Sequence, residues 1–439
     1  MKKKTFILVF LLAVNILFPL TVCAKDFAKE DSLSSKNIAV INADNGFLVY
    51  TKNATERISP ASATKIMTAL LALEHFEGRL QTTVTVPAAA TRGLEGSAVL
   101  NLKAGEEIAV IDLIHAALIA GMNDAANTLA FAIGGTMADF VRMMNEKAQA
   151  LGAENTLFVN PTGLDSAAYT TAADLAQIAF HAYENRLFMQ IASKRAYQVA
   201  ATNMHEAVTI YTRNPLLTPQ SEYYYSYAEG MCAGYSENDG ALVVTAVSYG
   251  TYPYICVAAG APKTSGGTIG AYSDVRSLLA WASYNFAERK ILDRSKILCE
   301  MPVRAGDGVS HVLVVPDQSV YAFLDVDADL SAITLHEDLY YKKLNAPVEK
   351  GEIVGSVMIV LDGDPIGSTS LIAKTSIRRS SLGGFFLFWE NVLTSPIFLI
   401  AAAAALLFLI WHIIKKSPRF QKKKPINPKK QANNNHKSI

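Results

Sequence analysis

The chain has 439 residues, which is enough for two or three domains, and its formal net charge at pH 7 is +1. Much of the positive charge lies at the two ends, so the part between them is acidic. An acidic body does not suggest a nucleic-acid partner, and we expect none. The hydrophobic content of 51% is only slightly above the globular average, and much of the excess also lies at the ends.

The N-terminus has the pattern of a secretory signal. Basic residues 2–4 precede an apolar run from Phe6 to Leu20, and a small-residue cleavage site follows at Ala24. We therefore predict a signal peptide over residues 1–24. An uncleaved membrane anchor is the alternative, and a lipid attachment site at Cys23 is disfavoured because the bulky Val22 precedes it.

The first expected element of the exported part is a hairpin over residues 36–53, in which apolar runs flank an Asn45-Gly46 turn signal. A helix should follow from about Ser62 to Leu73, because its apolar residues recur at helical spacing. Helical patterns dominate residues 110–191, strand patterns return at 241–249 and 254–259, and a last helix is expected over 273–286.

This order predicts an α+β domain over residues 25–288, whose sheet takes strands from both ends of the segment. Short strands and turns from 291 to 377 predict a small β domain. Residues 378–395 form a linker rich in Ser, Gly and aromatic residues. The cysteines that remain after the signal peptide, Cys232, Cys256 and Cys299, are odd in number and lack metal-ligand spacing, so we expect neither a disulfide framework nor a metal site.

Near the C-terminus an apolar stretch is long enough to cross a bilayer. Residues 396–414 are predicted to form a transmembrane helix, in which His412 is the one strongly polar side chain. The tail, residues 415–439, has eight lysines, one arginine and no acid. The positive-inside rule places this tail in the cytoplasm and the body of the protein outside. Nucleic-acid binding by the tail is the weaker interpretation, because the tail directly follows an apolar span.

A candidate nucleophile lies at the start of the first helix. Ser62 and Lys65 form a Ser-x-x-Lys pair, and residues three apart share one helix face. A serine hydroxyl is a poor nucleophile unless a nearby base removes its proton. A lysine can be that base when burial or a neighbouring cation lowers its pKa. The pair alone is a weak signal, and a surface helix is the alternative; its position just after a hairpin in an exported chain strengthens it.

Through this segment the chain resembles the D-alanyl-D-alanine carboxypeptidases, the low-molecular-mass penicillin-binding proteins, which carry Ser-x-x-Lys, Ser-x-Asn and Lys-Thr-Gly. Further stretches within residues 36–377 resemble the same family: Met144–Ala148, Phe158–Asp165, Tyr169–Leu175 and Ala346–Gly351. The resemblance implies a DD-peptidase/β-lactamase-like catalytic domain, an antiparallel sheet flanked by helices, followed by the small β domain.

The resemblance also implies the chemistry. Ser62 would attack the D-Ala-D-Ala end of a peptidoglycan stem peptide, Lys65 would take its proton, and backbone N–H groups of Ser62 and Tyr235 would form the oxyanion hole. β-Lactam antibiotics would be covalent inhibitors. No metal or cofactor is implied.

Two of the three motifs are altered. The second falls on Gly121-Met122-Asn123, so Asn123 is a catalytic candidate while Gly121 replaces the serine. A loop or helix-cap role is the alternative for Asn123. The third falls on Cys232-Ala233-Gly234, where only Gly234 persists and still permits close backbone approach.

The expected substrate-binding residues are therefore Gly121, Cys232, Ala233, Gly234 and Tyr235. An arginine that members of the family use to hold the substrate carboxylate falls at Pro253. The nearby residues 263–265 are interpreted as part of a turn and not as a replacement motif.

The lost lysine has a consequence for the base. Without its charge, the pKa of Lys65 should be higher than in members with the intact motif. Less of the amine would then be neutral at pH 7, so Lys65 should be a less effective base there. Cys232 is interpreted as a small apolar filler, with a reactive cleft thiol as the alternative.

Three hypotheses follow. The first is a membrane-anchored serine D-Ala-D-Ala carboxypeptidase, of reduced activity if the altered motifs weaken it. The second is a degenerate member that binds wall peptide or a partner protein without turnover; the altered motifs favour it and the intact Ser62 and Lys65 pair disfavours it. The third is a β-lactamase, against which the β domain and the anchor argue.

Overall fold

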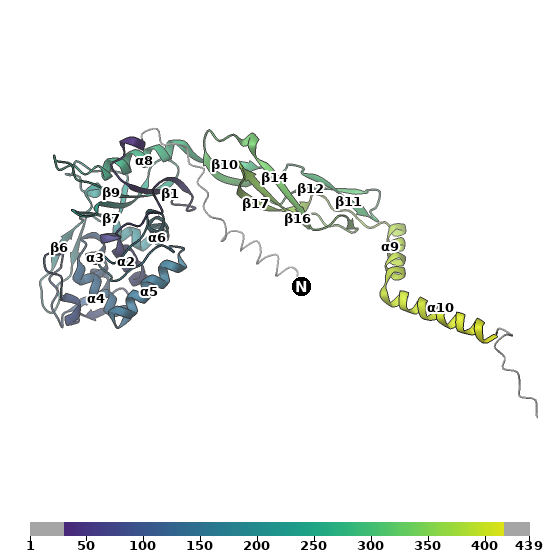
Figure 1. Cartoon of the computed structure of the whole chain (residues 1–439), viewed down its shortest axis with the longest axis horizontal. Helices are drawn as coiled ribbons and strands as arrows, with labels where there is room; N and C mark the ends of the chain where they lie inside the picture. The colour runs from purple at the N-terminus through teal and green to yellow at the C-terminus, as the bar shows by residue number, and fades with distance from the viewer. Residues whose placement is uncertain (1–29, 417–439) are drawn as a thin grey trace, which may run out of the picture. The chain divides into compact units, whose positions relative to one another are not determined.

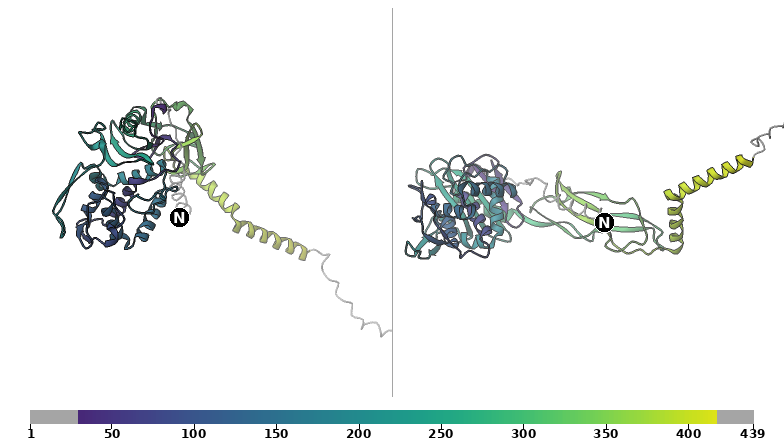
Figure 2. Two further views of the ribbon diagram at one scale, coloured as in Figure 1. Left: turned by 60° about the vertical axis from the view of Figure 1, so that its left-hand side comes forward. Right: turned by 90° about the horizontal axis from the view of Figure 1, so that it is seen from below.

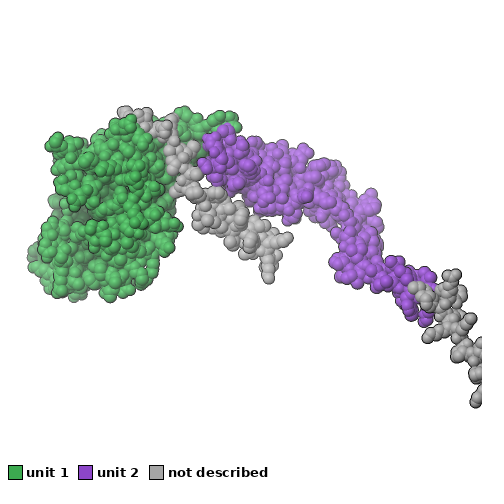
Figure 3. All heavy atoms as spheres, viewed as in Figure 1, with its two compact units in different colours: residues 1–289, 322–331 green, residues 290–321, 332–439 purple. Residues whose placement is uncertain are grey.

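The structure is a computed structural model that describes residues 30–416. The predicted signal peptide and nearly all of the basic tail lie outside the described residues. The chain divides into two compact units, shown in different colours in Figure 3. The first comprises residues up to 289 together with 322–331, and the second comprises 290–321 and the residues from 332 onward.

Five strands form the sheet of the first unit, in the order β2-β1-β9-β8-β7. They are β1 (Asn37–Asn42), β2 (Leu48–Lys52), β7 (Ala228–Ser236), β8 (Gly240–Ser248) and β9 (Pro253–Ala261). The antiparallel pairing of β1 with β2 confirms the hairpin predicted around Asn45-Gly46. β1 also pairs with β9, so strands from both ends of the segment share the sheet, as predicted.

Both faces of this sheet are buried. In β1, Ala39 and Ile41 join the core on the side of the helices, whereas Ile38 and Val40 join a second core that includes residues of α8 (Ala271–Asn285). Successive side chains of a strand point to opposite faces, so a strand covered on both sides is apolar along its whole length. This explains why the β1 sequence shows a continuous apolar run.

Helices α2 to α6 lie on one side of the sheet and α8 on the other (Figure 1). Thr136 and Thr171 cap α5 and α6, because their side-chain oxygens accept backbone N–H groups of Asp139 and Asp174. The helical region and the last helix occur where the apolar periodicity predicts them. The helices on the first side are α2 (Thr64–His75), α3 (Val110–Ile119), α4 (Asn123–Gly134), α5 (Met137–Ala150), α6 (Ala172–Glu184) and the shorter α7 (Arg186–Ala192).

Two small hairpins were not predicted. β3 (Thr83–Thr85) pairs with β4 (Glu107–Ala109), and β5 (Ala196–Val199) pairs with β6 (Val208–Tyr211). These strands have three or four residues each and are largely exposed. So short an exposed strand shows no clear apolar alternation, which is the signal that the sequence interpretation used.

The first unit also takes in residues that the sequence analysis placed in the small β domain. Phe323 of β13 (Val320–Asp325) stacks on Phe286, at the start of β10 (Phe286–Leu292), with ring centroids 6.0 Å apart. It also contacts Phe47 at 5.8 Å. The apolar pattern of β13 shows that the strand is half-buried, but the pattern does not show which core buries it.

The second unit contains a six-stranded sheet in the order β14-β16-β17-β12-β11-β15. Alternate apolar residues of its longer strands, among them Val312 and Val314, form its separate core. The strands are β11 (Cys299–Arg304), β12 (His311–Pro316), β14 (Thr334–Leu339), β15 (Leu344–Asn345), β16 (Ile353–Leu361) and β17 (Asp364–Ala373). The predicted small β domain is thus present.

Two further helices follow this sheet, and Figure 2 shows them as separate elements. α9 (Ser381–Thr394) occupies the expected linker, and α10 (Pro396–Lys416) occupies the expected span. Extended backbone at Ser395 ends α9, and Pro396 begins α10, a position that suits proline because the first helical N–H has no partner inside the helix. Within the described residues, Pro396–Ile413 is the one helix long and apolar enough to cross a membrane, with a mean hydropathy of 2.3.

Candidate active site

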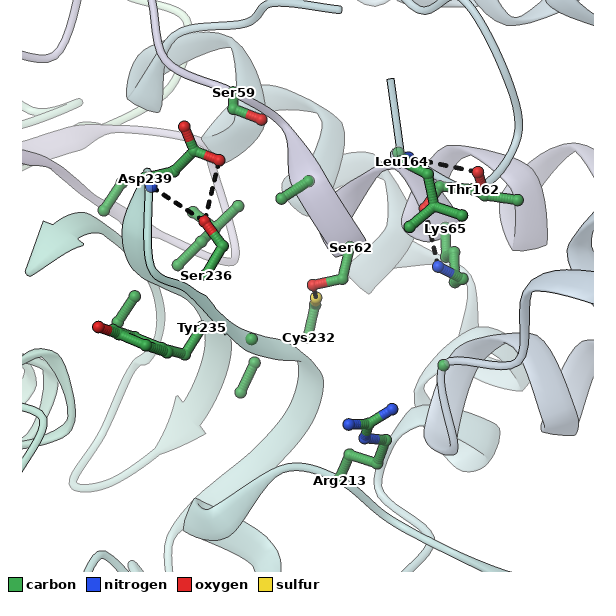
Figure 4. A pocket seen from close by; sticks show the side chains of 18 of the residues that line it. Ser59, Ser62, Lys65, Thr162, Leu164, Arg213, Cys232, Tyr235, Ser236 and Asp239 are labelled. Carbon is green, nitrogen blue, oxygen red and sulfur yellow. Dashed lines mark hydrogen bonds between the residues drawn. The ribbon is translucent and has the colours of Figure 1, made fainter. Parts of the chain in front are cut away.

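A cleft of about 910 Å³ opens in the first unit and brings together residues from distant parts of the chain. Ser62, Lys65, Gly121, Asn123 and residues 232–235 all line it. The structure therefore places every catalytic and substrate-binding candidate of the sequence analysis at one site. Figure 4 shows the side chains around Ser62.

Ser62 lies in a single turn of 3₁₀ helix, η2 (Ala61–Ala63), which leads directly into α2. The Ala63 N–H donates to Pro60 O at 2.9 Å and closes the turn. Ala61 has a φ of 40°, in the left-handed region that residues other than glycine rarely adopt. Such strain persists where the surrounding structure holds the backbone in place. Here the strained residue directly precedes Ser62, whose hydroxyl lies at the N-terminal end of α2.

Lys65, one turn further on, is 5% exposed, and its amine donates to the backbone carbonyl of Thr162 at 2.8 Å. Burial lowers the pKa of Lys65 from 10.5 to about 8. A nearby positive charge on Arg213 also lowers it, while Cys232 acts in the opposite direction. The neutral amine that general-base catalysis requires is thus accessible near neutral pH.

The carbonyl that receives Lys65 belongs to a tight turn over residues 160–163. The Asn160 side-chain oxygen accepts the N–H of Thr162 at 3.0 Å and that of Gly163 at 2.7 Å. Gly163 has a φ of 78°, and a Cβ there would lie only 1.7 Å from Ala61 O. The turn can therefore pack against the nucleophile segment only with glycine at this position.

The opposite wall is β7. A register shift between Ala228 and Met231 marks a β-bulge just before Cys232, and Gly230 and Met231 have φ values of 103° and 92°. Bulges of this kind re-aim the side chains that follow them. The result is that Cys232 Sγ lies 3.2 Å from Ser62 Oγ, in hydrogen-bond contact (Figure 4).

Cys232 is half-buried, and burial raises the pKa of its thiol. The thiol therefore stays protonated at neutral pH, which disfavours Cys232 as the nucleophile. Two residues on, Gly234 faces Ser62 so closely that a Cβ there would lie 2.6 Å from Ser62 Oγ. A side chain at position 234 would therefore displace the Ser62 hydroxyl from its present position.

Asn123 is the first residue of α4 and is 3% exposed. The N-cap of this helix is Met122, without a side-chain cap, so the helix-cap alternative for Asn123 does not apply. Its N–H donates to Ala98 O at 2.8 Å, and its side-chain oxygen is buried without a hydrogen-bond partner among the described residues. The neighbouring Asp124 accepts the N–H of Leu100 at 2.9 Å and fixes the loop against the start of the helix.

The predicted Ser62 and Lys65 pair shares the cleft, but no hydrogen bond joins the two side chains in the described part of the protein. Each has a different partner, Cys232 for the hydroxyl and the Thr162 carbonyl for the amine. Helical spacing placed the two groups on one face, and the contacts of that face with other segments set their hydrogen bonds.

Tyr235 also lines the cleft. Tyr235 is half-buried, and Lys263 lies over its ring at 6.0 Å. Lys263 belongs to a turn closed by an isolated bridge to Ile269, which confirms that residues 263–265 are not a cleft-edge motif. Pro253, where the family's arginine would fall, begins β9 and is not among the residues that line the cleft in the described structure.

Family comparisons agree with this geometry. Residues 24–263 match the D-alanyl-D-alanine carboxypeptidase family, and residues 286–379 match the penicillin-binding protein 5 C-terminal domain. The chain belongs to the D-alanyl-D-alanine carboxypeptidase family. The family match covers the five-stranded sheet, helices α2 to α7 and every cleft-lining residue except Tyr272. The C-terminal match covers the second unit's sheet.

Relatives extend over nearly the whole chain. D-alanyl-D-alanine carboxypeptidase DacF of Bacillus subtilis is 25% identical over 386 residues, covering 85% of this chain and 95% of that protein. DacA of Haemophilus influenzae is 26% identical over 406 residues, covering 89% and 98%. The crystal structure of penicillin-binding protein 5 from Haemophilus influenzae superposes with a TM-score of 0.60 at 26% identity, covering 79% of this chain and 98% of that one.

Two parts of this site were not predicted from the sequence: the backbone carbonyl of Thr162 and the side chain of Arg213. Thr162 lies in a stretch that resembles the family, but its contact with Lys65 was not predicted. The contact is made by the backbone carbonyl of Thr162, and a backbone contact does not depend on the residue type, so the sequence does not reveal it. Arg213 lines the cleft from a loop with no motif of its own. Within residues 30–416, no group of three or more His, Cys, Asp or Glu side chains is arranged to hold a metal ion.

Proposed function

We propose that this protein is a serine-type D-alanyl-D-alanine carboxypeptidase that acts on peptidoglycan stem peptides through an acyl-enzyme on Ser62. The observation that carries the proposal is the buried Lys65, whose pKa is lowered to about 8, lining the same cleft as the Ser62 hydroxyl. Membership of the carboxypeptidase family supports the substrate class.

The first step is attack by Ser62 Oγ on the carbonyl carbon of the penultimate D-Ala. The neutral Lys65 amine accepts the hydroxyl proton. The C–N bond to the terminal D-Ala then breaks, and the departing amine takes up this proton, which leaves Lys65 neutral again. A neutral amine has two N–H donors and one lone pair; donation to Thr162 O leaves the lone pair available for the proton. Water then attacks the ester and restores the Ser62 hydroxyl.

Backbone N–H groups of Ser62 and Tyr235 are the proposed donors to the oxyanion. They need no particular side chain, so the loss of lysine and threonine at Cys232 and Ala233 does not remove them. The buried, unsatisfied side-chain oxygen of Asn123 is the proposed acceptor for an N–H of the substrate. An unmade hydrogen bond costs about 1–3 kcal/mol for a buried group, and a ligand that makes it recovers this free energy.

The other segments of the chain are proposed to place the site outside the membrane. We propose that residues 1–24 direct export, that α10 anchors the protein in the membrane with its basic tail on the cytoplasmic side, and that the cleft lies outside. In this scheme residues 25–288 form the catalytic domain and residues 291–377 form the small β domain. α9, with exposed Phe385, Phe386 and Trp389, would contact the bilayer interface.

Labelling with a fluorescent penicillin tests the central step. We expect one covalent adduct on the full-length protein, none on Ser62→Ala, and release of D-Ala from a peptide that ends in D-Ala-D-Ala. A protein that binds such peptides yet forms no adduct would be a wall-binding protein without turnover. Rapid turnover of the penicillin itself would indicate a β-lactamase.

A further inference from the structure

The cleft contains a cation that none of the three motifs supplies. Arg213 follows β6 and precedes η4 (Pro215–Leu217), and its exposed side chain lines the cleft. Within residues 30–416 its guanidinium group makes no hydrogen bond and no ion pair. In Figure 4 the guanidinium group is turned toward the space beside Cys232 and Lys65.

The backbone of Arg213 is held firmly although its side chain has no partner. The Arg213 N–H donates to Ile119 O at 3.0 Å, at the end of α3. The next residue, Asn214, is 6% exposed, and its side-chain oxygen accepts the Leu216 N–H at 3.0 Å to cap η4. These bonds fix the point from which the side chain enters the cleft, so little backbone ordering is needed when a ligand binds.

The side chain of Arg213 lies beside the altered second motif. Gly121 has a φ of 70°, and a Cβ there would lie 3.8 Å from Arg213 Cδ. This is an ordinary van der Waals distance, so the stem of Arg213 passes directly over Gly121. The altered third motif removes the competing charge, because Cys232 and Ala233 are both neutral.

We propose that Arg213 is the carboxylate receptor of this cleft and binds the C-terminal carboxylate of the acyl-donor peptide. The inference rests on the proposed function, which supplies a substrate that ends in a carboxylate. A guanidinium group presents a planar fork of N–H donors that matches both oxygens of a carboxylate, and charge-assisted pairs of this kind are among the strongest hydrogen bonds in proteins.

Two observations support the assignment. The positive charge of Arg213 is felt at Lys65, where it adds to the effect of burial in lowering the pKa of the amine. Two other cations of the cleft are engaged, since Arg57 lies 4.0 Å over the ring of Tyr169 and Lys65 donates to Thr162. Lys36 also lines the cleft and is the rival receptor.

Binding measured without turnover gives the sharpest test. In full-length Ser62→Ala protein in detergent, a peptide ending in D-Ala-D-Ala and the same peptide with a C-terminal amide are titrated by NMR or calorimetry. We expect the acid to bind about 10- to 100-fold more tightly than the amide, as a charge-assisted pair predicts. Adding Arg213→Gln should abolish this preference, while Arg213→Lys should retain part of it.

Arg195→Gln is the matched control. Arg195 belongs to the same segment, but its guanidinium group donates to Tyr224 OH at 3.0 Å and does not line the cleft, so the preference for the acid should remain. An unchanged preference in Arg213→Gln, or its loss in Lys36→Gln instead, overturns the inference. A melting temperature equal to that of the parent shows that each variant is folded.

Covalent labelling of the protein with Ser62 intact separates this inference from the function on which it rests. If penicillin acylates Ser62 but the preference for the acid does not depend on position 213, the inference fails alone. If the preference depends on Arg213 but Ser62 is never acylated, the enzyme proposal fails and Arg213 remains a receptor in a binding protein.

Discussion

The Lys65 amine donates a hydrogen bond of 2.8 Å to the backbone carbonyl of Thr162. The bond orients the amine inside a buried site, and burial lowers its pKa to about 8. It also ties α2 to the turn over residues 160–163, which approaches the nucleophile segment so closely that only glycine fits at 163. The state of the base and the position of the nucleophile therefore depend on the same turn.

The acylation rate should rise with pH up to about 8. Lys65 acts as a base only when neutral, and with a pKa of about 8 roughly one amine in ten is neutral at pH 7. The second-order rate constant for penicillin acylation should increase about tenfold per pH unit below 8 and level off above it. A rate that is flat from pH 6 to 9 would contradict the role of Lys65.

Gly234→Ala should block the nucleophile while leaving the fold intact. The added Cβ would lie 2.6 Å from Ser62 Oγ, well inside van der Waals contact. We expect penicillin labelling to fall by about 100-fold or more, because a small misplacement at a reacting centre can cost that much. Gly266→Ala is the matched control, since its Cβ would meet nothing closer than 3.9 Å; equal labelling by the two variants would count against the prediction.

Restoring the third motif should increase the neutral fraction of Lys65 at pH 7 and so speed acylation. In Cys232→Lys combined with Ala233→Thr, the new cation disfavours protonated Lys65, so its pKa should fall and the acylation plateau should begin at a lower pH. The acylation rate at pH 7 should rise about tenfold, equivalent to one pKa unit.

Cys299→Lys is the control for this gain. It adds the same charge to the second unit, at a half-buried position, and should leave both the rate and its pH dependence unchanged. If the restored motif leaves the profile in place, the loss of the lysine has no bearing on Lys65.

A buried histidine should make the first unit less stable in acid. His115 is 2% exposed and stacks on Tyr197 with ring centroids 3.5 Å apart, and burial lowers its pKa to about 4. Below pH 6.5 the unfolded chain takes up a proton at this position, whereas the folded protein does not until about pH 4. The free energy of unfolding should therefore drop by about 1.4 kcal/mol per pH unit over this interval.

Urea unfolding of the parent and of His115→Phe, at pH 7 and pH 4.5, isolates this contribution. Phenylalanine keeps a ring against Tyr197 but does not titrate, so the variant should lose less stability on acidification than the parent. An equal loss in both proteins would assign the acid sensitivity to other groups.

Most of the structure that could be predicted followed from the spacing of apolar residues within single elements. The apolar alternation and the Asn45-Gly46 signal predicted the hairpin. Helical periodicity predicted α2, α8 and the helical region that contains α3 to α7, because both patterns follow from the geometry of the element itself. The short exposed hairpin of β5 and β6 has no such pattern and was missed. The packing of Phe323 on Phe286 was not predicted for a related reason, since an apolar pattern indicates burial but does not indicate the burying partner.

The sequence by itself determined that Ser62 and Lys65 share one helical face and that the second and third motifs are altered. It also determined that residues 396–414 are apolar over a length that can cross a bilayer. These are properties of residue type and of spacing within a few residues. Only the tertiary structure decided that Lys65 meets Thr162, 97 positions away, that Ser62 meets Cys232, 170 positions away, and that Arg213 enters the same cleft. Such contacts depend on how the sheet, bulge and turns pack together, and no local pattern records which distant segment will lie opposite.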